Sequence, residues 1–112
     1  MPKLFAVYLG GAAPGSNIEL HDVQFVVGET IEDTYQDLLK LWYGLPESLH
    51  LDSYVALEVV DGRRVSLSRT GTDGGDRLFF VNLGAYREGV FGEFHANRFV
   101  VARHQGRTAK PA

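Results

Sequence analysis

Apolar residues recur at every second position in two stretches of the chain, which predicts a β-strand in each. Residues 3–9 read KLFAVYL and residues 77–83 read RLFFVNL. The shared Phe-x-Val-x-Leu pattern puts three apolar side chains on one face, because side chains alternate between the two faces of a strand. Glycines at positions 10 and 84 end these strands. The chain is then predicted to return as a second strand, at 22–28 and again at 96–102.

The two stretches belong to a longer internal repeat. Residues 3–27 and 77–101 align without a gap at a shift of 74 positions, and eleven aligned positions are identical. Chance similarity between β-rich segments can supply matching aliphatic residues, but it rarely supplies two glycines, a glutamate and a histidine in register as well. We therefore predict an internal duplication of one strand–loop–strand unit.

A helix is predicted directly after the first copy. Apolar residues recur there at the spacing of one helix face: Ile31, Tyr35, Leu38, Leu39 and Trp42. Thr30 suits the N-cap position with Asp33 three residues later, and Gly44 and Pro46 follow the apolar stripe. The second copy is followed by ARHQGRTAKPA, which has no apolar stripe and predicts no second helix.

Between the copies the pattern predicts a hairpin. Residues 50–60 alternate as a strand, residues 64–69 are its predicted partner, and Asp61-Gly62 is a strong turn signal. The expected fold is α+β, in the order β-β-α-β-β-β-β, with one helix and a mainly antiparallel six-stranded sheet that holds both copies side by side. One helix cannot cover both faces of such a sheet, so a homodimer is the expected assembly.

Length and composition limit the function classes. With 112 residues, the chain is expected to form a single α+β domain over 1–104 and a flexible tail at 105–112. It has no cysteine, which excludes thiol catalysis and Cys-based metal sites and suits the cytoplasm. A net charge of −3 with dispersed charges argues against a nucleic-acid partner. No apolar run approaches the ~20 residues of a membrane span.

The strongest candidate for chemistry is a repeated Glu-x-His pair, Glu19 with His21 and Glu93 with His95. This spacing puts both side chains of a pair on one face of a strand. If a pseudo-twofold axis relates the copies, the pairs converge into a site of two imidazoles and two carboxylates. Such a site suits a divalent metal (zinc, manganese or iron) or acid–base catalysis. The alternative is structural, with each histidine tying down its glycine-bearing loop and the glutamate as its partner.

His50 and Asp52 form a second, weaker polar pair at strand spacing. Local hydrogen bonding at the entry to a strand is the simpler interpretation of this pair. The glycine-rich stretches 10–15 and 70–76 lack the lysine and the following helix of a phosphate-binding P-loop, so they are interpreted as turns. No cofactor is predicted apart from the divalent metal.

Three blocks of the sequence carry a resemblance. They are LFAVYLGG with ELHDVQFVVG near the start, HLDS at 50–53, and LFFVNLGAY with EFH and VVA in the second copy. Together they resemble an uncharacterised bacterial family, the domain of unknown function number 1543, over residues 3–103. The resemblance implies a small bacterial protein in which the unit occurs once or twice, and it implies no activity. Longer members continue after the VVA block into a further helix, so the resemblance implies a truncated second unit.

The sequence therefore predicts a protein of unknown function that is a small, non-catalytic binding or interaction module and acts as a homodimer. Its ligand is not specified by any motif. The alternative is a metal-dependent site or enzyme that uses the repeated Glu-x-His pairs.

Overall fold

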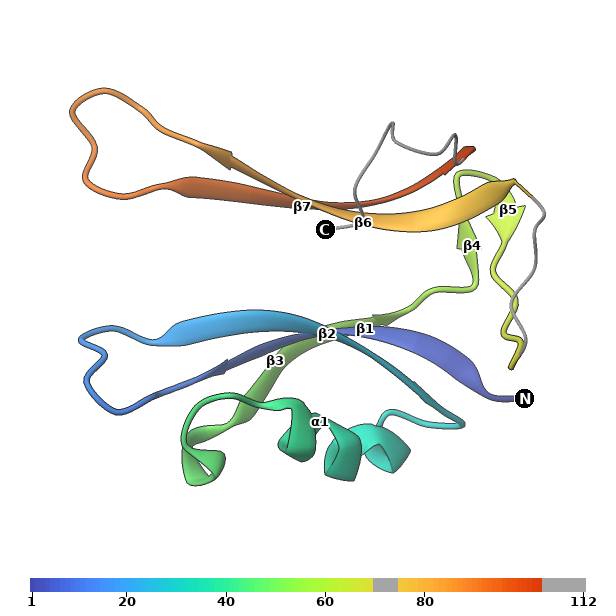
Figure 1. Ribbon diagram of the computed structural model, residues 1–112, viewed down its shortest axis with the longest axis horizontal. Helices are drawn as coiled ribbons and strands as arrows, with labels where there is room; N and C mark the ends of the chain where they lie inside the picture. The colour runs from blue at the N-terminus through green and yellow to red at the C-terminus, as the bar shows by residue number, and fades with distance from the viewer. Residues whose placement is uncertain (70–74, 104–112) are drawn as a thin grey trace. The chain divides into compact units, whose positions relative to one another are not determined.

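The computed structural model describes residues 1–69 and 75–103. The chain divides into two compact units, Met1–Glu58 and Val59–Ala112, and each unit contains one long antiparallel hairpin (Figure 1). The predicted tail at 105–112 and residues 70–74 of the glycine-rich stretch lie outside the described residues. The single domain over 1–104 stays a prediction.

The first unit contains a three-stranded antiparallel sheet in the order β2-β1-β3. Strand β1 spans Lys3–Gly11, β2 spans Leu20–Gly28 and β3 spans His50–Ala56. β1 is central because its hairpin partner β2 takes one edge, while β3 returns along the other edge. The β1–β3 register shifts between Tyr8 and Leu9, where β3 carries one extra residue.

A helical segment lies across one face of this sheet (Figure 1). It begins as a 3-10 turn, Glu32–Thr34, and continues as α1, Tyr35–Leu41; a second 3-10 turn, Pro46–Ser48, leads into β3. The Thr30 N–H donates to the Asp33 carboxylate at 3.1 Å, which is the reciprocal half of a capping box. The predicted helix is therefore present, although its first turn is 3-10. No helical segment within the described residues has the length and apolar character that crossing a membrane requires.

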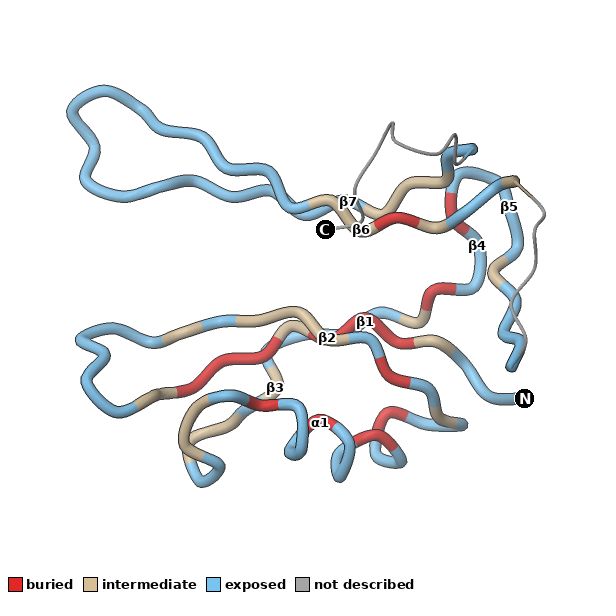
Figure 2. Tube along the Cα trace, viewed as in Figure 1, coloured by how far each residue is buried: buried red, intermediate tan, exposed pale blue. Residues whose placement is uncertain are grey.

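The core of the first unit lies between the helical segment and the sheet, where buried residues gather (Figure 2). Its members come from β1, β2 and the predicted helical stripe: Phe5, Val7, Leu9, Val26, Ile31, Leu38 and Trp42. Burying an aliphatic or aromatic side chain of this size contributes roughly 1.5–3 kcal/mol. Tyr35 and Leu39 also belong to the predicted stripe but are exposed, so the buried face of the helical segment is narrower than predicted.

A short hairpin opens the second unit. Strand β4, Val59–Val60, pairs with β5, Arg63–Arg64. The turn between them has Asp61 at φ 51° and Gly62 at φ 74°, and positive φ at both central residues is the type I′ conformation that Asp-Gly predicts. The Asp61 carboxylate accepts a hydrogen bond from the backbone N–H of Val101 at 2.8 Å, which ties this turn to the long hairpin of the same unit.

The long hairpin of the second unit is formed by β6, Asp76–Ala85, and β7, Phe94–Arg103. Each residue pair of β1–β2 has a counterpart in β6–β7 exactly 74 positions further along the chain. The two hairpins differ in burial. Residues 82–98, which we call the distal hairpin, are all exposed (Figure 2).

The predicted single six-stranded sheet is wrong. Within residues 1–69 and 75–103 the strands form three separate sheets, β2-β1-β3, β4-β5 and β6-β7. β3 occupies the second edge of β1, and among the described residues no strand of the second copy pairs with the outer edge of β2 or β3. The predicted strand at 50–60 is also divided, because its first part pairs with β1 and only Val59–Val60 enters the Asp61-Gly62 hairpin. The α+β class with mainly antiparallel pairing is confirmed.

Candidate functional site

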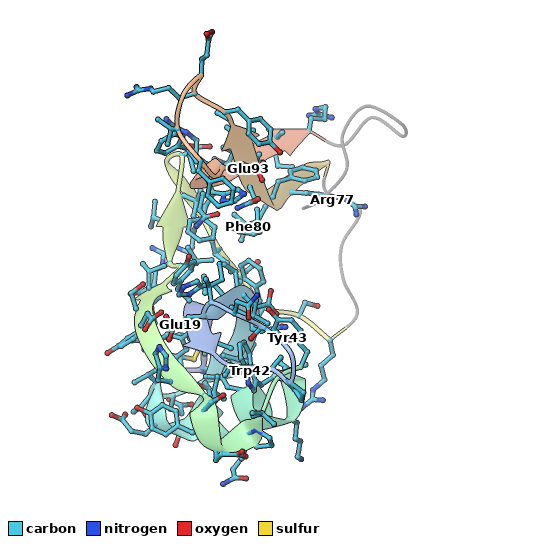
Figure 3. The ribbon with its side chains drawn as sticks, turned by 90° about the vertical axis from the view of Figure 1, so that its left-hand side faces the viewer. Glu19, Trp42, Tyr43, Arg77, Phe80 and Glu93 are labelled. Carbon is cyan, nitrogen blue, oxygen red and sulfur yellow. The ribbon has the colours of Figure 1, made fainter. Side chains whose placement is uncertain are left out.

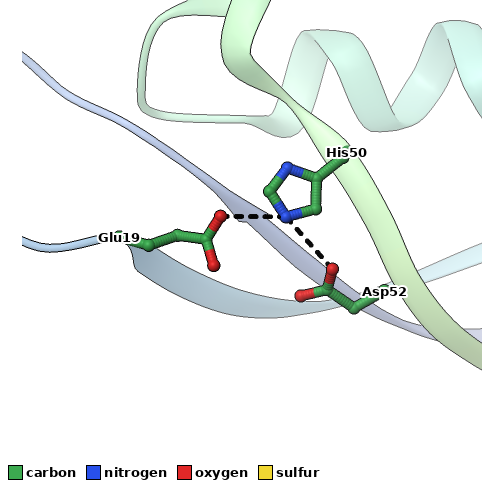
Figure 4. A group of neighbouring side chains, drawn as sticks. All are labelled: Glu19, His50 and Asp52. Carbon is green, nitrogen blue, oxygen red and sulfur yellow. Dashed lines mark ion pairs between the residues drawn. The ribbon is translucent and has the colours of Figure 1, made fainter.

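Four polar side chains converge at one end of the β2-β1-β3 sheet. Glu19 lies in the loop that leads into β2, His21 lies at the start of β2, and His50 and Asp52 lie at the start of β3. Figure 4 shows the side chains of Glu19, His50 and Asp52 directed toward one another. Two pairs that the sequence suggested separately thus form one group, which we call the His-carboxylate cluster.

The His-carboxylate cluster is a closed ring in which imidazoles and carboxylates alternate. Glu19 places Oε1 3.4 Å from Nε2 of His21 and Oε2 3.0 Å from Nε2 of His50. Asp52 places Oδ1 3.1 Å from Nε2 of His50 and Oδ2 3.5 Å from Nδ1 of His21. Each carboxylate therefore contacts both imidazoles, using a different oxygen for each.

These side chains are partly exposed, from 33% for Asp52 to 48% for Glu19. Ion pairs at such positions contribute only roughly 0.2–1 kcal/mol each, because water screens the charges and two side chains must be held in place. Stability alone is therefore a weak reason for four ionisable groups to gather at this point of the surface.

Backbone carbonyls hold both imidazoles through Nδ1. Nδ1 of His21 lies 3.2 Å from the carbonyl oxygen of Leu9, and Nδ1 of His50 lies 3.3 Å from that of Ser48. Because a carbonyl oxygen can only accept, the network assigns the Nδ1 proton in each ring. The His21 ring also stacks on Tyr8, with centroids 5.1 Å apart and planes 20° from parallel. Both rings consequently present Nε2 to the carboxylate of Glu19.

Gly10 leaves the space that the cluster fills. It lies in β1 and is the register partner of His21 on one side and of His50 on the other. A Cβ atom at position 10 would come within 2.8 Å of Nε2 of His50 and 3.0 Å of Oδ2 of Asp52. From the sequence, Gly10 was predicted only to end a strand, whereas it lies within β1 and makes room for two side chains of β3. Glycine within a strand is also a signal for close approach by another group.

The second unit contains half of this arrangement. Nε2 of His95 lies 3.3 Å from Oε1 of Glu93, a contact equivalent to that in the first copy. A Cβ atom at Gly84 would collide with the Glu93 carboxylate, so this glycine also provides space for a side chain. In the described part of the second unit, β6 pairs only with β7 and no third strand adds further ligands.

The predicted site shared by both Glu-x-His pairs stays a prediction. Glu19 lies in the first unit and Glu93 in the second (Figure 3), and each glutamate contacts the histidine of its own pair. In the first unit the Glu-x-His pair gains two further partners, because His50 and Asp52 complete the cluster.

A hollow of about 380 Å³ lies beside the cluster, between α1 and the start of β3. Its lining is mostly leucine, with Tyr35, Gln36, Pro46 and His50. His50 therefore borders both the polar cluster and an apolar hollow, which gives a bound ligand two kinds of surface.

Comparisons with known proteins agree with the predicted resemblance. The family model Domain of Unknown Function (DUF1543) matches residues 16–67, a range that contains all four residues of the His-carboxylate cluster. The chain is also similar to the crystal structure of a protein Il1583 from Idiomarina loihiensis, with 46% identity and a TM-score of 0.76 over 93% of this chain. This chain covers 65% of that protein chain, which is less than two thirds of its length. Among curated proteins none matches.

The fold and the matched range thus point to an α+β domain similar to an uncharacterised family. Residues 16–67 match the DUF1543 family, as the sequence blocks predicted, and the similarity to an Idiomarina protein is consistent with a bacterial origin. The family assigns no activity, and its function is unknown.

Proposed function

We propose that the chain is a non-catalytic interaction module that forms a homodimer through the distal hairpin, residues 82–98. A contrast between equivalent positions carries this proposal. Leu9 of β1 is 1% exposed, whereas Leu83, its counterpart in β6, is 50% exposed. One strand position is thus a core position in the first hairpin and a surface position in the second.

The distal hairpin lacks the cover that the first hairpin has. In the first unit, α1 and β3 pack against the corresponding residues. A two-stranded hairpin with both faces in water is marginally stable at best. Large apolar side chains are exposed along it, and a concentration of such residues is typical of an interaction surface: Leu83, Tyr86, Val90, Phe91 and Phe94.

A second copy of the chain is the partner that best fits this surface. Its three aromatic side chains can bury roughly 450–750 Å², and a standard interface needs about 800 Å² per partner. Charges of both signs surround the apolar residues: Arg87, Glu88, Glu93 and Arg98. In a twofold arrangement the basic residues of one copy can face the acidic residues of the other, which makes the surface self-complementary.

We interpret the two long hairpins, β1–β2 and β6–β7, as products of an internal duplication. Eleven sequence identities and a pairing register that recurs after 74 residues support this origin. We place the module in the cytoplasm, in keeping with its lack of cysteine. No nucleic-acid partner is assigned, because a chain with a net charge of −3 lacks the excess of basic residues that binds phosphates.

Sedimentation velocity over a hundredfold concentration range tests the dimer. The expected species at high concentration has twice the 12.4 kDa chain mass. Phe91→Ser is expected to shift the chain to monomer, because Phe91 is fully exposed in the patch. Ile18→Ser is the matched control, since Ile18 is an exposed apolar residue in the loop of the first hairpin. A concentration-independent monomer would contradict the proposal, as would equal effects of both substitutions.

A further inference from the structure

We infer that Glu19, His50 and Asp52 bind a divalent first-row transition-metal ion and that His21 positions the two carboxylates. Each of the three ligand residues offers one atom, and these atoms all lie within 4.8 Å of one another. The site belongs to the first unit alone. It therefore does not depend on the dimer proposed above.

The space between Nε2 of His50 and the two carboxylates suits either a metal ion or a proton on Nε2. Because Nδ1 of His50 donates to the Ser48 carbonyl, Nε2 of the uncharged ring carries a lone pair. That lone pair would face carboxylate oxygens of Glu19 at 3.0 Å and Asp52 at 3.1 Å. Three electron-rich atoms so close together repel one another unless a metal ion lies among them or Nε2 carries a proton.

A metal ion accounts for more of this geometry than a proton does. A single Nε2 proton makes one straight hydrogen bond, so two oxygens at nearly equal distance would have to share it. An ion with ligands at ~2.0–2.1 Å separates neighbouring ligand atoms by roughly 2.8–3.0 Å in octahedral geometry and by roughly 3.3–3.4 Å in tetrahedral geometry. The two separations from Nε2 of His50, 3.0 and 3.1 Å, lie close to the octahedral values. Metal-binding histidines also commonly donate their other N–H to a backbone carbonyl, as His50 does.

Gly10 supplies a second, independent observation. The strand beneath the cluster has no side chain at Gly10, where a Cβ atom would push His50 and Asp52 aside. His21 meanwhile contacts the outer oxygen of each carboxylate, at 3.4 Å for Glu19 and 3.5 Å for Asp52. His21 therefore lies against both carboxylates, in the place of a positioning residue, and its Nε2 donates to Glu19 when the ring carries both protons.

The ligand set limits the ion. Imidazole with two carboxylates suits Zn²⁺, Mn²⁺ or Fe²⁺, whereas Ca²⁺ and Mg²⁺ prefer oxygen ligands alone. Only three protein atoms would coordinate the ion, and the side chains are partly exposed. The remaining coordination positions therefore face solvent, where water or an anionic oxygen ligand can occupy them.

The second unit provides an internal control. Glu93 and His95 repeat the glutamate–histidine contact of the first copy at nearly the same distance. In the described residues they have no counterparts of His50 and Asp52 beside them. If a Glu-x-His pair were sufficient to bind a metal ion, both copies would bind; if β3 is needed, only the first copy would bind tightly.

Calorimetric titration of the full chain with ZnCl₂, after removal of metal by a chelator, tests the inference. One tight site per chain is expected. His50→Ala and Glu19→Gln should each weaken zinc binding by about 100-fold or more, because each removes a ligand. His95→Ala, the matched control in the second copy, should change the affinity less than about twofold.

Co²⁺ as a probe distinguishes the positioning role of His21 from the role of a metal ligand. His21→Ala should weaken binding by about 10–100-fold, as loss of an outer-shell contact does, while the visible absorption bands of bound Co²⁺ keep their positions. His50→Ala should remove those bands. Asp52→Asn, which preserves side-chain shape, guards against misfolding, and circular dichroism verifies the fold of each variant. Absence of saturable zinc binding by the unmodified chain would overturn the inference, as would zinc binding by His50→Ala and Asp52→Asn as tight as that of the unmodified chain.

Discussion

Gly10 of β1 and His50 of β3 are register partners, and a methyl group on Gly10 would lie 2.8 Å from Nε2 of His50. Gly10→Ala should therefore displace the imidazole and weaken zinc binding by about 10-fold or more, without removing any ligand. The free energy of unfolding should change by less than ~1 kcal/mol, because the displaced groups are the ends of partly exposed side chains. Calorimetric titration and urea unfolding measure the two effects.

Gly84→Ala is the control for this substitution. The same change in the second copy meets the Glu93 side chain, which supplies the three nearest atoms, so zinc affinity should stay at the level of the unmodified chain. Equal losses of affinity for Gly10→Ala and Gly84→Ala would contradict the role assigned to Gly10.

Two leucines of α1 should differ sharply in their contribution to stability. Leu38 is 2% exposed within the core, whereas Leu41 is 46% exposed on the same helix. Leu38→Ala is expected to lower the free energy of unfolding by about 2–5 kcal/mol, through lost burial and the cavity left behind. Leu41→Ala should lower it by about 0.5 kcal/mol. Urea unfolding followed by circular dichroism compares them, and similar losses would show that α1 does not pack as described.

Asp61 combines an unusual backbone conformation with a specific hydrogen bond. It has φ 51° in the type I′ turn and accepts the Val101 N–H at 2.8 Å. Asp61→Ala should destabilise the second unit by about 1–3 kcal/mol, because alanine disfavours positive φ and leaves this N–H without its partner. Asp61→Asn should cost less, since asparagine tolerates the conformation and keeps an acceptor oxygen. Hydrogen exchange at the Val101 amide is the measurement, and equal protection in both variants would refute this explanation.

Local signals in the sequence were sufficient for the individual elements of the fold. The alternation around Phe5 and Phe79 predicted both long hairpins, and Asp61-Gly62 predicted the type I′ turn, because each depends on neighbouring residues. The choice of strand partners could not be predicted in this way. The alternating pattern of residues 50–56 is compatible with pairing to any strand. β3 pairs with β1 because the chain returns past α1 to the free edge of β1.

The full set of residues in the candidate site also could not be predicted from local sequence signals. Spacing of two residues suggested the pairs Glu19 with His21 and His50 with Asp52, and the side chains of each pair lie in contact. The two pairs lie in one cluster because of the β1–β3 register and the bulge that adds Asp52 beside His50. Neither feature is encoded in a short motif. A search for glycine opposite two histidines, as at Gly10, would have required the strand order first.

The imidazole ¹⁵N resonances of the histidines test the central claim most directly, namely that β3 completes a metal site that a Glu-x-His pair alone does not form. One equivalent of Zn²⁺ is expected to shift Nε2 of His50 strongly while its Nδ1 stays protonated, because Nδ1 donates to the Ser48 carbonyl. The resonances of His95 should not move. An unshifted His50 Nε2, or parallel shifts of His50 and His95, would contradict the account.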